Sequence, residues 1–358
     1  MAARSNAAFA SDAIQAEAIL LCAMIGSAAT NHRGDAAAMV AIAVLDDYQN
    51  VALRMADWSG LQKSHRLVVF NQRLNDVESA ARALADFDVV CVMRERMPVP
   101  RVLFERLPKL RLLVTTGKRN ASIDMAAAAD HKVVVCGAGG GYGSGLSTAE
   151  LAIGLMLAMA RHLREEFHAM RPGGGWQTTV GFDLDGRTLG IIGLGNLGSK
   201  VGKIGAAIGM KVIAWSENLT PERAKERGAE RVDKDELFRR ADVVSIHSVL
   251  SPRTRGLVGA RELALMKPTA ILINTSRGPI VDEGALLAAL REKRIAGYGA
   301  DTYDAEPLPS NHPLRSEPRA LLTPHLGYVT EETYRGFYTG TVAAIEGWLA
   351  GKPVGVIT

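Results

Sequence analysis

From Met39 to the C-terminus, short apolar segments alternate with segments whose apolar residues recur at helical spacing. The short segments are continuously apolar and rich in β-branched residues, which is typical of strands buried on both faces of a parallel sheet. Helices placed between such strands form βαβ units. The pattern therefore predicts an α/β protein with doubly wound parallel sheets.

The alternation falls into two series. The first predicts strands at 41–45, 67–70, 88–93, 111–115 and 133–136. The second begins at Thr188 and predicts strands at 189–192, 211–215, 243–247, 271–274, 298–301 and 321–323, with helices at 196–208 and 283–293 between them. A long apolar helix at 147–166, capped by Ser147 or Thr148 in a capping box with Glu150, follows the first series. The last helix, at about 331–349, is capped by Thr330.

Composition narrows the function classes. The chain is 47% hydrophobic and 22% charged, as in globular proteins, and aromatic residues make up only 5%, which argues against a base-stacking nucleic-acid surface. The net charge of +4 is spread along the chain. Three cysteines, Cys22, Cys91 and Cys136, show neither metal-ligand spacing nor a disulfide framework. We expect a cytoplasmic protein with no metal, no nucleic-acid partner and no membrane association.

The N-terminus is ambiguous. Residues 16–29 form an apolar run that is too short to span a bilayer. Arg4 before the run and small residues after it are features of a signal peptide, whereas Asp12 and Glu17 lie where a signal peptide should be positive. We interpret residues 1–38 as a disordered N-terminal extension, with export as the alternative.

Gly193, Gly195 and Gly198 form a Gly-x-Gly-x-x-Gly motif between a predicted strand and a predicted helix. The first glycine permits a tight turn, the second lets the backbone approach a pyrophosphate, and the third lets the helix pack closely on the strand. The N-terminus of the helix favours negative charge. The motif predicts a dinucleotide site, which also includes Asn196 and Leu197.

The residue that holds the adenine ribose is expected at the end of the next strand, about 20 residues further on. Ser216 stands where an Asp would specify NAD, and Glu217 follows it. The charge of Glu217 would repel a 2′-phosphate, and no Arg is adjacent in the sequence, so NAD is favoured over NADP. The other glycine run, 137–145, lacks the full motif and is interpreted as a crossover between domains.

These elements predict two domains. A Rossmann domain that binds NAD is expected at 148–326. It is inserted in a discontinuous flavodoxin-like substrate domain formed by 39–147 and 327–358, because the last helix is needed to cover the first series of strands.

Three charged residues each follow a predicted strand of the second series: Arg277, Glu306 and His325. The carboxyl ends of parallel strands are where ligands bind. Together the three form the set that oxidation of a 2-hydroxy acid needs. Arg277 offers a forked cation for carboxylate and carbonyl oxygens, His325 is an acid/base near neutral pH, and Glu306 can orient the imidazole.

From about Met39 to the C-terminus, the chain resembles the D-isomer-specific 2-hydroxy acid dehydrogenases, which include D-lactate, glycerate and 3-phosphoglycerate dehydrogenases. The most specific segments are LGIIGLGNLGSKV, ADVVSIHSVLSPRTRGLVG, MKPTAILINTSRGPIVDEGALLAAL, GADTYDAEPLP and LLTPHLG. The resemblance implies that Arg277, Glu306 and His325 are the catalytic triad and that Asp301 holds the nicotinamide carboxamide. It also implies a homodimer formed through the cofactor domains.

The resemblance leaves the particular 2-hydroxy or 2-oxo acid open. It implies that the backbone after Thr116 and Gly117 meets the substrate carboxylate, but the sequence continues with Lys118 and Arg119 where the family has x-Gly. Ala121 replaces a usual Asp, and His247 is followed by a segment that departs from the family's His-x-Pro-Leu-Thr. Arg94 and Arg96 follow the third predicted strand and are candidates for a distal carboxylate or phosphate, the alternative being a solvated loop.

Other functions fit part of this pattern. A formate dehydrogenase would be expected to carry Gln in place of Glu306, whereas phosphite oxidation would keep all three charged residues. A non-catalytic, corepressor-like protein that senses NAD(H) would keep the glycine motif but would not need His325. The predicted function is an NAD-dependent dehydrogenase that acts on a small D-2-hydroxy acid.

Overall fold

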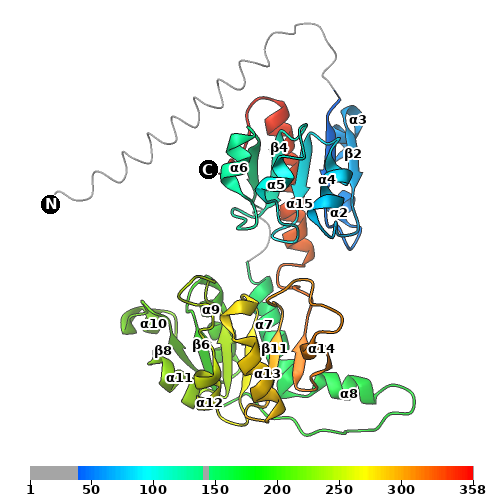
Figure 1. Cartoon of the computed structure of the whole chain (residues 1–358). Helices are drawn as coiled ribbons and strands as arrows, with labels where there is room; N and C mark the ends of the chain where they lie inside the picture. The colour runs from blue at the N-terminus through cyan, green and yellow to red at the C-terminus, as the bar shows by residue number, and fades with distance from the viewer. Residues whose placement is uncertain (1–38, 140–144, 358) are drawn as a thin grey trace, which may run out of the picture. The chain divides into compact units, whose positions relative to one another are not determined.

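The computed structural model describes residues 39–139 and 145–357 (Figure 1). The chain divides into two compact units. Unit 1 takes the chain up to Gly141 and again from Arg335, and unit 2 is Tyr142–Tyr334. The expected N-terminal extension and residues 140–144 of the second glycine run lie outside the described residues.

Unit 1 contains a five-stranded sheet in which every strand pair is parallel. Its strands are β1 (Ala41–Val44), β2 (Arg66–Val69), β3 (Val89–Val92), β4 (Leu112–Thr116) and β5 (Val134–Ala138). The strand order, β2-β1-β3-β4-β5, is that of flavodoxin-like sheets. Chain order and space order therefore differ at β1, where the winding direction reverses.

Helices cover both faces of this sheet. They are α2 (Ala52–Met55), α3 (Ser59–Ser64), α4 (Val77–Leu84), α5 (Arg101–Phe104), α6 (Met125–Asp130) and α15 (Glu331–Leu349). Leu84 of α4 and Phe104 of α5 enter one core cluster with Val90 and Leu113 of the sheet. The last helix also joins unit 1, since the ring of Tyr338 meets that of Trp58 edge to face at 6.3 Å.

Unit 2 contains a seven-stranded parallel sheet in the order β12-β11-β10-β9-β6-β7-β8. The strands are β6 (Thr188–Ile192), β7 (Lys211–Trp215), β8 (Glu230–Arg231), β9 (Val243–Ile246), β10 (Ile271–Asn274), β11 (Gly297–Ala300) and β12 (Ala320–Leu322). This is the Rossmann order extended by one strand, and its winding reverses between β6 and β9. The predicted fold class is confirmed in both units.

Side chains that alternate along these strands supply two cores. Ile191, Ala214 and Ile273 pack in the cluster that includes helix α7, whereas Ile192 and Leu272 pack on the other face. In the described part of unit 2, the helices and a 3-10 turn are α7 (Ser147–Ala160), α8 (Leu163–Ala169), α9 (Asn196–Ala207), α10 (Pro221–Glu226), α11 (Lys234–Arg240), α12 (Ala260–Leu265), η1 (Gly278–Ile280), α13 (Glu283–Arg291) and α14 (Pro313–Ser316). None of the helices in the described ranges has the length and apolar character that crossing a bilayer requires.

Two details of the predicted helices are wrong. The helix expected at 147–166 is broken between α7 and α8, because His162 adopts a left-handed conformation with φ of 50°. The expected capping box is not formed either, since the N-cap of α7 is Leu146 and makes no side-chain cap bond. The Thr148 hydroxyl donates instead to the carbonyl of Gly327 at 2.8 Å. At the last helix, Thr330 does accept the Thr333 N–H, at 3.4 Å.

The second unit boundary falls inside α15 rather than at the expected 326/327. The physical reason lies in the segment before the helix. Leu326 and Gly327 donate their N–H groups to the carboxylate of Asp301, and Gly327 accepts from Thr148, so this segment is bonded to unit 2. The first boundary, expected at 147/148, falls at Gly141.

Candidate active site

The glycine motif lies where the sheet of unit 2 reverses its winding. Gly193 has φ of +93° and follows β6, and a Cβ at this position would lie 2.8 Å from the backbone carbon of His247, which follows β9. A Cβ at Gly198 would lie 2.2 Å from the carbonyl oxygen of Gly193. Side chains at either position would collide with backbone, so the tight turn and the close packing of α9 both require glycine.

Gly195 has a different environment. Within residues 39–139 and 145–357, no atom lies within 4 Å of the position that its Cβ would take, so the described part of the chain leaves the space beside its backbone open. Gly195 is also the N-cap of α9, and no side chain caps this helix. Asn196 and Leu197 form the first turn, whose N–H groups are available to an anion. The motif therefore fits the pyrophosphate of a dinucleotide.

At the far end of the motif, two side chains hold the residue between the first two glycines. The Leu194 N–H donates to the hydroxyl of Ser216 at 3.2 Å, and the guanidinium of Arg227 donates to the Leu194 carbonyl. Ser216 directly follows β7, and Arg227 is the C-cap of α10. Glu217 is exposed. No Arg is adjacent to Ser216 in the sequence, but the fold brings Arg227 to the motif from further along the chain.

His325 and Glu306 are joined by a short hydrogen bond. Nδ1 of His325 lies 2.5 Å from Oε2 of Glu306, and the other carboxylate oxygen accepts the N–H of Tyr303 at 2.9 Å. Burial raises the pKa of Glu306, but the bonds from His325 and Tyr303 and the charge of Arg277 outweigh it, so the net pKa lies below the usual value. Glu306 is therefore ionised at neutral pH and fixes the orientation of the imidazole.

Asp301 holds the segment that carries His325. Its buried carboxylate accepts the hydroxyl of Thr323 at 2.6 Å and the N–H groups of Leu326 and Gly327 at 2.7 and 2.8 Å. Burial raises the pKa of Asp301, and these bonds only partly offset that effect. A carboxylate accepts about four hydrogen bonds, so one position is left for a further donor such as a carboxamide.

Arg277 follows β10 and is half-buried. Its backbone carbonyl accepts from the Asn274 side chain at 3.0 Å, and its guanidinium donates to the Ser276 carbonyl at 2.7 Å. A Cβ on the next residue, Gly278, would lie 2.1 Å from the backbone carbon of Tyr303. The Arg277 segment thus packs directly against the segment that leads to Glu306, so the fold brings the three sequence-predicted charged residues to one edge of the sheet.

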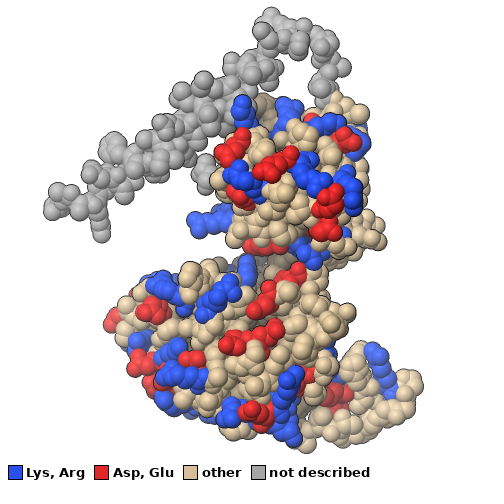
Figure 2. Space-filling model, viewed as in Figure 1, with Lys and Arg blue, Asp and Glu red and all other residues tan. Residues whose placement is uncertain are grey.

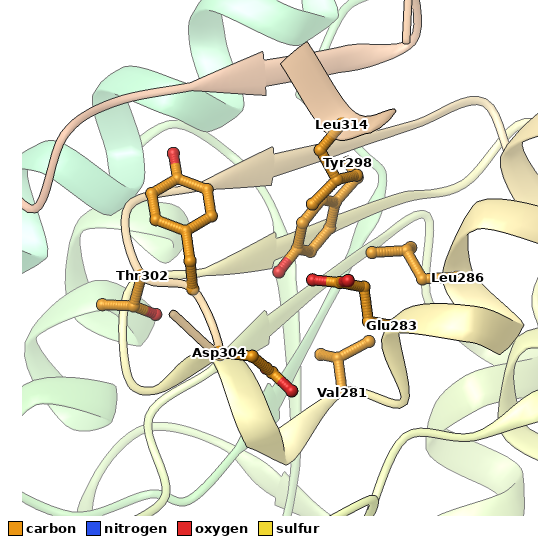
Figure 3. A pocket seen from close by; sticks show the side chains of 9 residues that line it. Val281, Glu283, Leu286, Tyr298, Thr302, Asp304 and Leu314 are labelled. Carbon is orange, nitrogen blue, oxygen red and sulfur yellow. The ribbon is translucent and has the colours of Figure 1, made fainter. Parts of the chain in front are cut away.

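A small acidic pocket lies beside these two segments (Figure 3). Gly278, Tyr298, Thr302 and Tyr303 contribute to its lining, and the carboxylates of Glu283 and Asp304 point into it. Burial and the charge of Glu283 raise the pKa of Asp304. Two carboxylates disfavour an anion, so a 2-oxo acid is expected to bind on the side of Arg277 and His325 rather than here.

The residues expected to bind substrate in unit 1 fall into two groups. Thr116 ends β4, and its hydroxyl accepts the N–H of Arg94 at 2.9 Å. A Cβ at Gly117, which has φ of +92°, would lie 2.0 Å from the guanidinium of Arg94. Lys118 is exposed beside this turn. Arg94, rather than Arg96, is therefore the cation that lies on Thr116 and Gly117.

Arg96 points elsewhere in unit 1. Its guanidinium donates to the Asp46 carbonyl at 2.6 Å and lies 4.6 Å from the centroid of the Tyr48 ring. Asp46 and Tyr48 follow β1, at the same edge of the sheet as Arg96. Neither residue was predicted as a site residue from the sequence, although both lie within three residues of the end of a predicted strand.

Tyr328 is a third residue at the site that was not predicted from the sequence. Its ring meets the imidazole of His325 edge to face, with centroids 5.4 Å apart and an interplanar angle of 69°. It follows His325 by three residues, which was the only signal available in the sequence. Its contact restricts the imidazole on a second side, in addition to the bond with Glu306.

Residues 153–327 match the NAD-binding domain of the D-isomer-specific 2-hydroxyacid dehydrogenases. A glyoxylate reductase from Aeropyrum pernix is 41% identical over 239 residues, which cover 64% of this chain and 71% of the relative. A hydroxypyruvate reductase from Blautia hydrogenotrophica is 30% identical over 84% of this chain and 94% of the relative. A phosphoglycerate oxidoreductase from Vibrio cholerae superposes with a TM-score of 0.82 at 35% identity, covering 87% of this chain and 99% of that one.

The two parallel sheets and the glycine motif define a dinucleotide-binding protein of the Rossmann class. The chain belongs to the D-isomer-specific 2-hydroxyacid dehydrogenase family, and its cofactor is NAD.

His247 generates a prediction about stability at the glycine motif. Burial lowers the pKa of His247 to about 4, and its Nε2 bonds the Ser245 hydroxyl at 2.8 Å. Between about pH 6.5 and pH 4, the unfolded chain therefore binds a proton at His247, whereas the folded chain does not. The free energy of unfolding should fall by up to about 1.4 kcal/mol per pH unit from this group as the pH drops from about 6.5 to 4.

Urea unfolding of the wild type and His247→Gln at a series of pH values would measure this effect. The variant should lose part of the pH dependence, whereas the matched change His168→Gln, at an exposed histidine, should keep it. Equal slopes for all three proteins would contradict the assignment of this effect to His247.

Proposed function

We propose that this chain interconverts a D-2-hydroxy acid and its 2-oxo acid, with NAD as the hydride carrier and His325 as the acid/base. The observation that carries the proposal is the 2.5 Å bond between His325 and Glu306. It lies at the carboxyl edge of the same sheet that presents the glycine motif. An imidazole held by an ionised carboxylate is the group that such a reaction requires.

In the proposed reaction, Nε2 of His325 takes the proton of the substrate hydroxyl, because Nδ1 is bonded to Glu306. When bound, NAD would accept the hydride from the substrate carbon that bears this hydroxyl group. Glu306 stabilises the imidazolium that results, and the guanidinium of Arg277 holds the carboxylate and the developing carbonyl oxygen. In the reverse direction His325 returns the proton.

The proposed cofactor contacts come from the motif and its neighbours. Backbone groups of Gly193, Gly195 and Gly198, with Asn196 and Leu197, would hold the pyrophosphate. Ser216 and Glu217 would lie at the adenine ribose, and Asp301 would use its remaining acceptor position for the nicotinamide carboxamide. The open space at Gly195 supports this arrangement.

For the substrate, we propose contacts with Thr116, Gly117 and Lys118 of unit 1, together with Arg94. The relatives named glyoxylate and hydroxypyruvate reductases suggest a short 2-oxo acid. Arg96 is proposed to bind a second anionic group where the substrate carries one. The position of its guanidinium, stacked on Tyr48 and bonded to the Asp46 carbonyl at the carboxyl edge of the sheet, supports this role.

The central prediction concerns His325→Asn. Turnover of NADH with a panel of short 2-oxo acids should fall about 10²- to 10⁴-fold, because general acid–base catalysis contributes that much. NADH binding, followed by its fluorescence, should persist. The matched control is His312→Asn, since His312 also pairs with a carboxylate, that of Glu283 at 3.0 Å, but lies outside the proposed site.

Three outcomes of this experiment would count against the proposal. Equal activity of His325→Asn and the wild type would remove His325 from the reaction. NADH binding without turnover of any 2-oxo acid would favour the sensing role, and turnover of phosphite would favour that reaction instead.

Arg96→Ala tests the distal contact. For 2-oxo acids with a second carboxylate or a phosphate, KM should rise about tenfold, a loss of about 1.4 kcal/mol, while kcat changes little. Acids without that group should be unaffected. Arg101→Ala is the control, because Arg101 forms an ion pair with Asp130 on the surface. An unchanged KM for every doubly anionic substrate would reject this role for Arg96.

We further propose a homodimer formed through unit 2. Residues 163–181, called the arm here, comprise α8 and the segment that returns from it, and they extend away from the rest of the unit (Figure 1). Glu166 braces the arm by accepting the Thr179 N–H at 2.6 Å. Large apolar side chains on it are exposed: Phe167 at 64%, Met170 at 65%, Trp176 at 75% and Val180 at 93%.

Figure 2 shows little charge over much of this arm. An ordered segment that exposes several large apolar side chains is typical of an interface, and a second copy of the chain is the proposed occupant. Trp176→Lys with Val180→Lys should shift the protein from dimer to monomer in sedimentation experiments. Leu53→Lys in unit 1, also at an exposed apolar residue, should not. A monomeric wild type would contradict the proposal.

A cytoplasmic location also remains a prediction.

A further inference from the structure

The adenosine end of the glycine motif lacks the carboxylate that usually receives the ribose hydroxyls. Ser216 occupies that position, and its hydroxyl already accepts the Leu194 N–H. The nearest acid in the sequence, Glu217, is exposed. The space beside Ser216 therefore does not carry the fixed negative charge by which NAD sites reject a 2′-phosphate.

A cation lies at the same place. The guanidinium of Arg227 donates to the carbonyl of Leu194, and the N–H of the same residue donates to Ser216. Arg227 and Ser216 therefore contact neighbouring peptide groups. The residue is exposed. Among the carboxylates of residues 39–139 and 145–357, none forms an ion pair with Arg227. Figure 2 shows Lys and Arg side chains at the end of unit 2 where α9 and α10 lie.

The bond to Leu194 uses only part of the guanidinium. Arg presents five N–H donors in a planar fork, and the fork matches two oxygens of a phosphate. Because one edge of the guanidinium is hydrogen-bonded to the Leu194 carbonyl, the Arg227 side chain loses little further conformational freedom when a phosphate binds its remaining N–H groups. A guanidinium that is charged, anchored and without an ion-pair partner is suited to a phosphate.

We propose that Arg227 forms a 2′-phosphate subsite, so that the chain accepts NADPH as well as NADH. The inference rests on the proposed function, since it concerns the cofactor of the same reaction. Glu217 opposes the phosphate, but water surrounds its side chain and screens its charge. The same carboxylate is free to accept the 2′-hydroxyl of NADH. The two side chains together account for the use of both cofactors.

The test is calorimetric titration of the whole protein with 2′,5′-ADP and with 5′-AMP, which differ only in the 2′-phosphate. The wild type should bind 2′,5′-ADP at least as tightly as 5′-AMP. Arg227→Ala should weaken 2′,5′-ADP about tenfold or more relative to 5′-AMP, because a charge-assisted fork is lost. The KM for NADPH should rise in the same proportion relative to that for NADH.

Ser216→Ala is the matched control. It breaks the other bond to Leu194 and leaves the charge of Arg227 in place, so it should affect the two nucleotides alike. If Arg227→Ala also weakened both equally, Arg227 would only support the loop and the proposal would be overturned. Binding of 5′-AMP without 2′,5′-ADP by the wild type would overturn it while leaving the dehydrogenase function standing. Binding of neither nucleotide would overturn both.

Discussion

The buried carboxylate of Asp301 is the group on which the rest of the site depends. Its three bonds to residues 323–327 fix a segment whose central residue, His325, has φ of 53°. A non-glycine residue in this conformation is stable only where its surroundings hold it. The bond from Thr148 to Gly327 ties the same segment to α7. The imidazole therefore reaches Glu306 from a backbone that is fixed at both ends.

Residues in the left-handed conformation also occur at the carboxyl edge of the sheet of unit 1. Asp46 and Arg94 follow β1 and β3 and have φ of 58° and 52°, and Gly117 follows β4 with φ of +92°. In both units, left-handed residues therefore occur at the carboxyl edge of the sheet, among those found elsewhere in the chain. Such residues turn the chain sharply, so that side chains and backbone groups face the edge rather than continue along the strand. Local strain and candidate chemistry coincide in both sheets.

The sequence was sufficient for features that depend on local pattern. The strands other than β8, both sheet classes and the glycine motif follow from hydrophobic runs and from spacing, as Ile191 and Gly193 illustrate. Strand β8 was not predicted, because Glu230 and Arg231 are exposed polar residues that form no hydrophobic run. Features that depend on long-range contacts could not be predicted. Arg227 comes from the end of another helix, and the choice between Arg94 and Arg96 at Gly117 depends on the direction of two side chains. The break at His162 was missed because helical periodicity continues through it.

The two units differ in when they can be completed. Unit 2 is one uninterrupted stretch of chain, whereas the core of unit 1 includes Trp58 near the start of the described residues and Tyr338 near their end. A ribosome releases the first segment long before the second. Until α15 has been synthesised, which is after unit 2, the apolar face of the unit 1 sheet that α15 covers stays exposed to solvent.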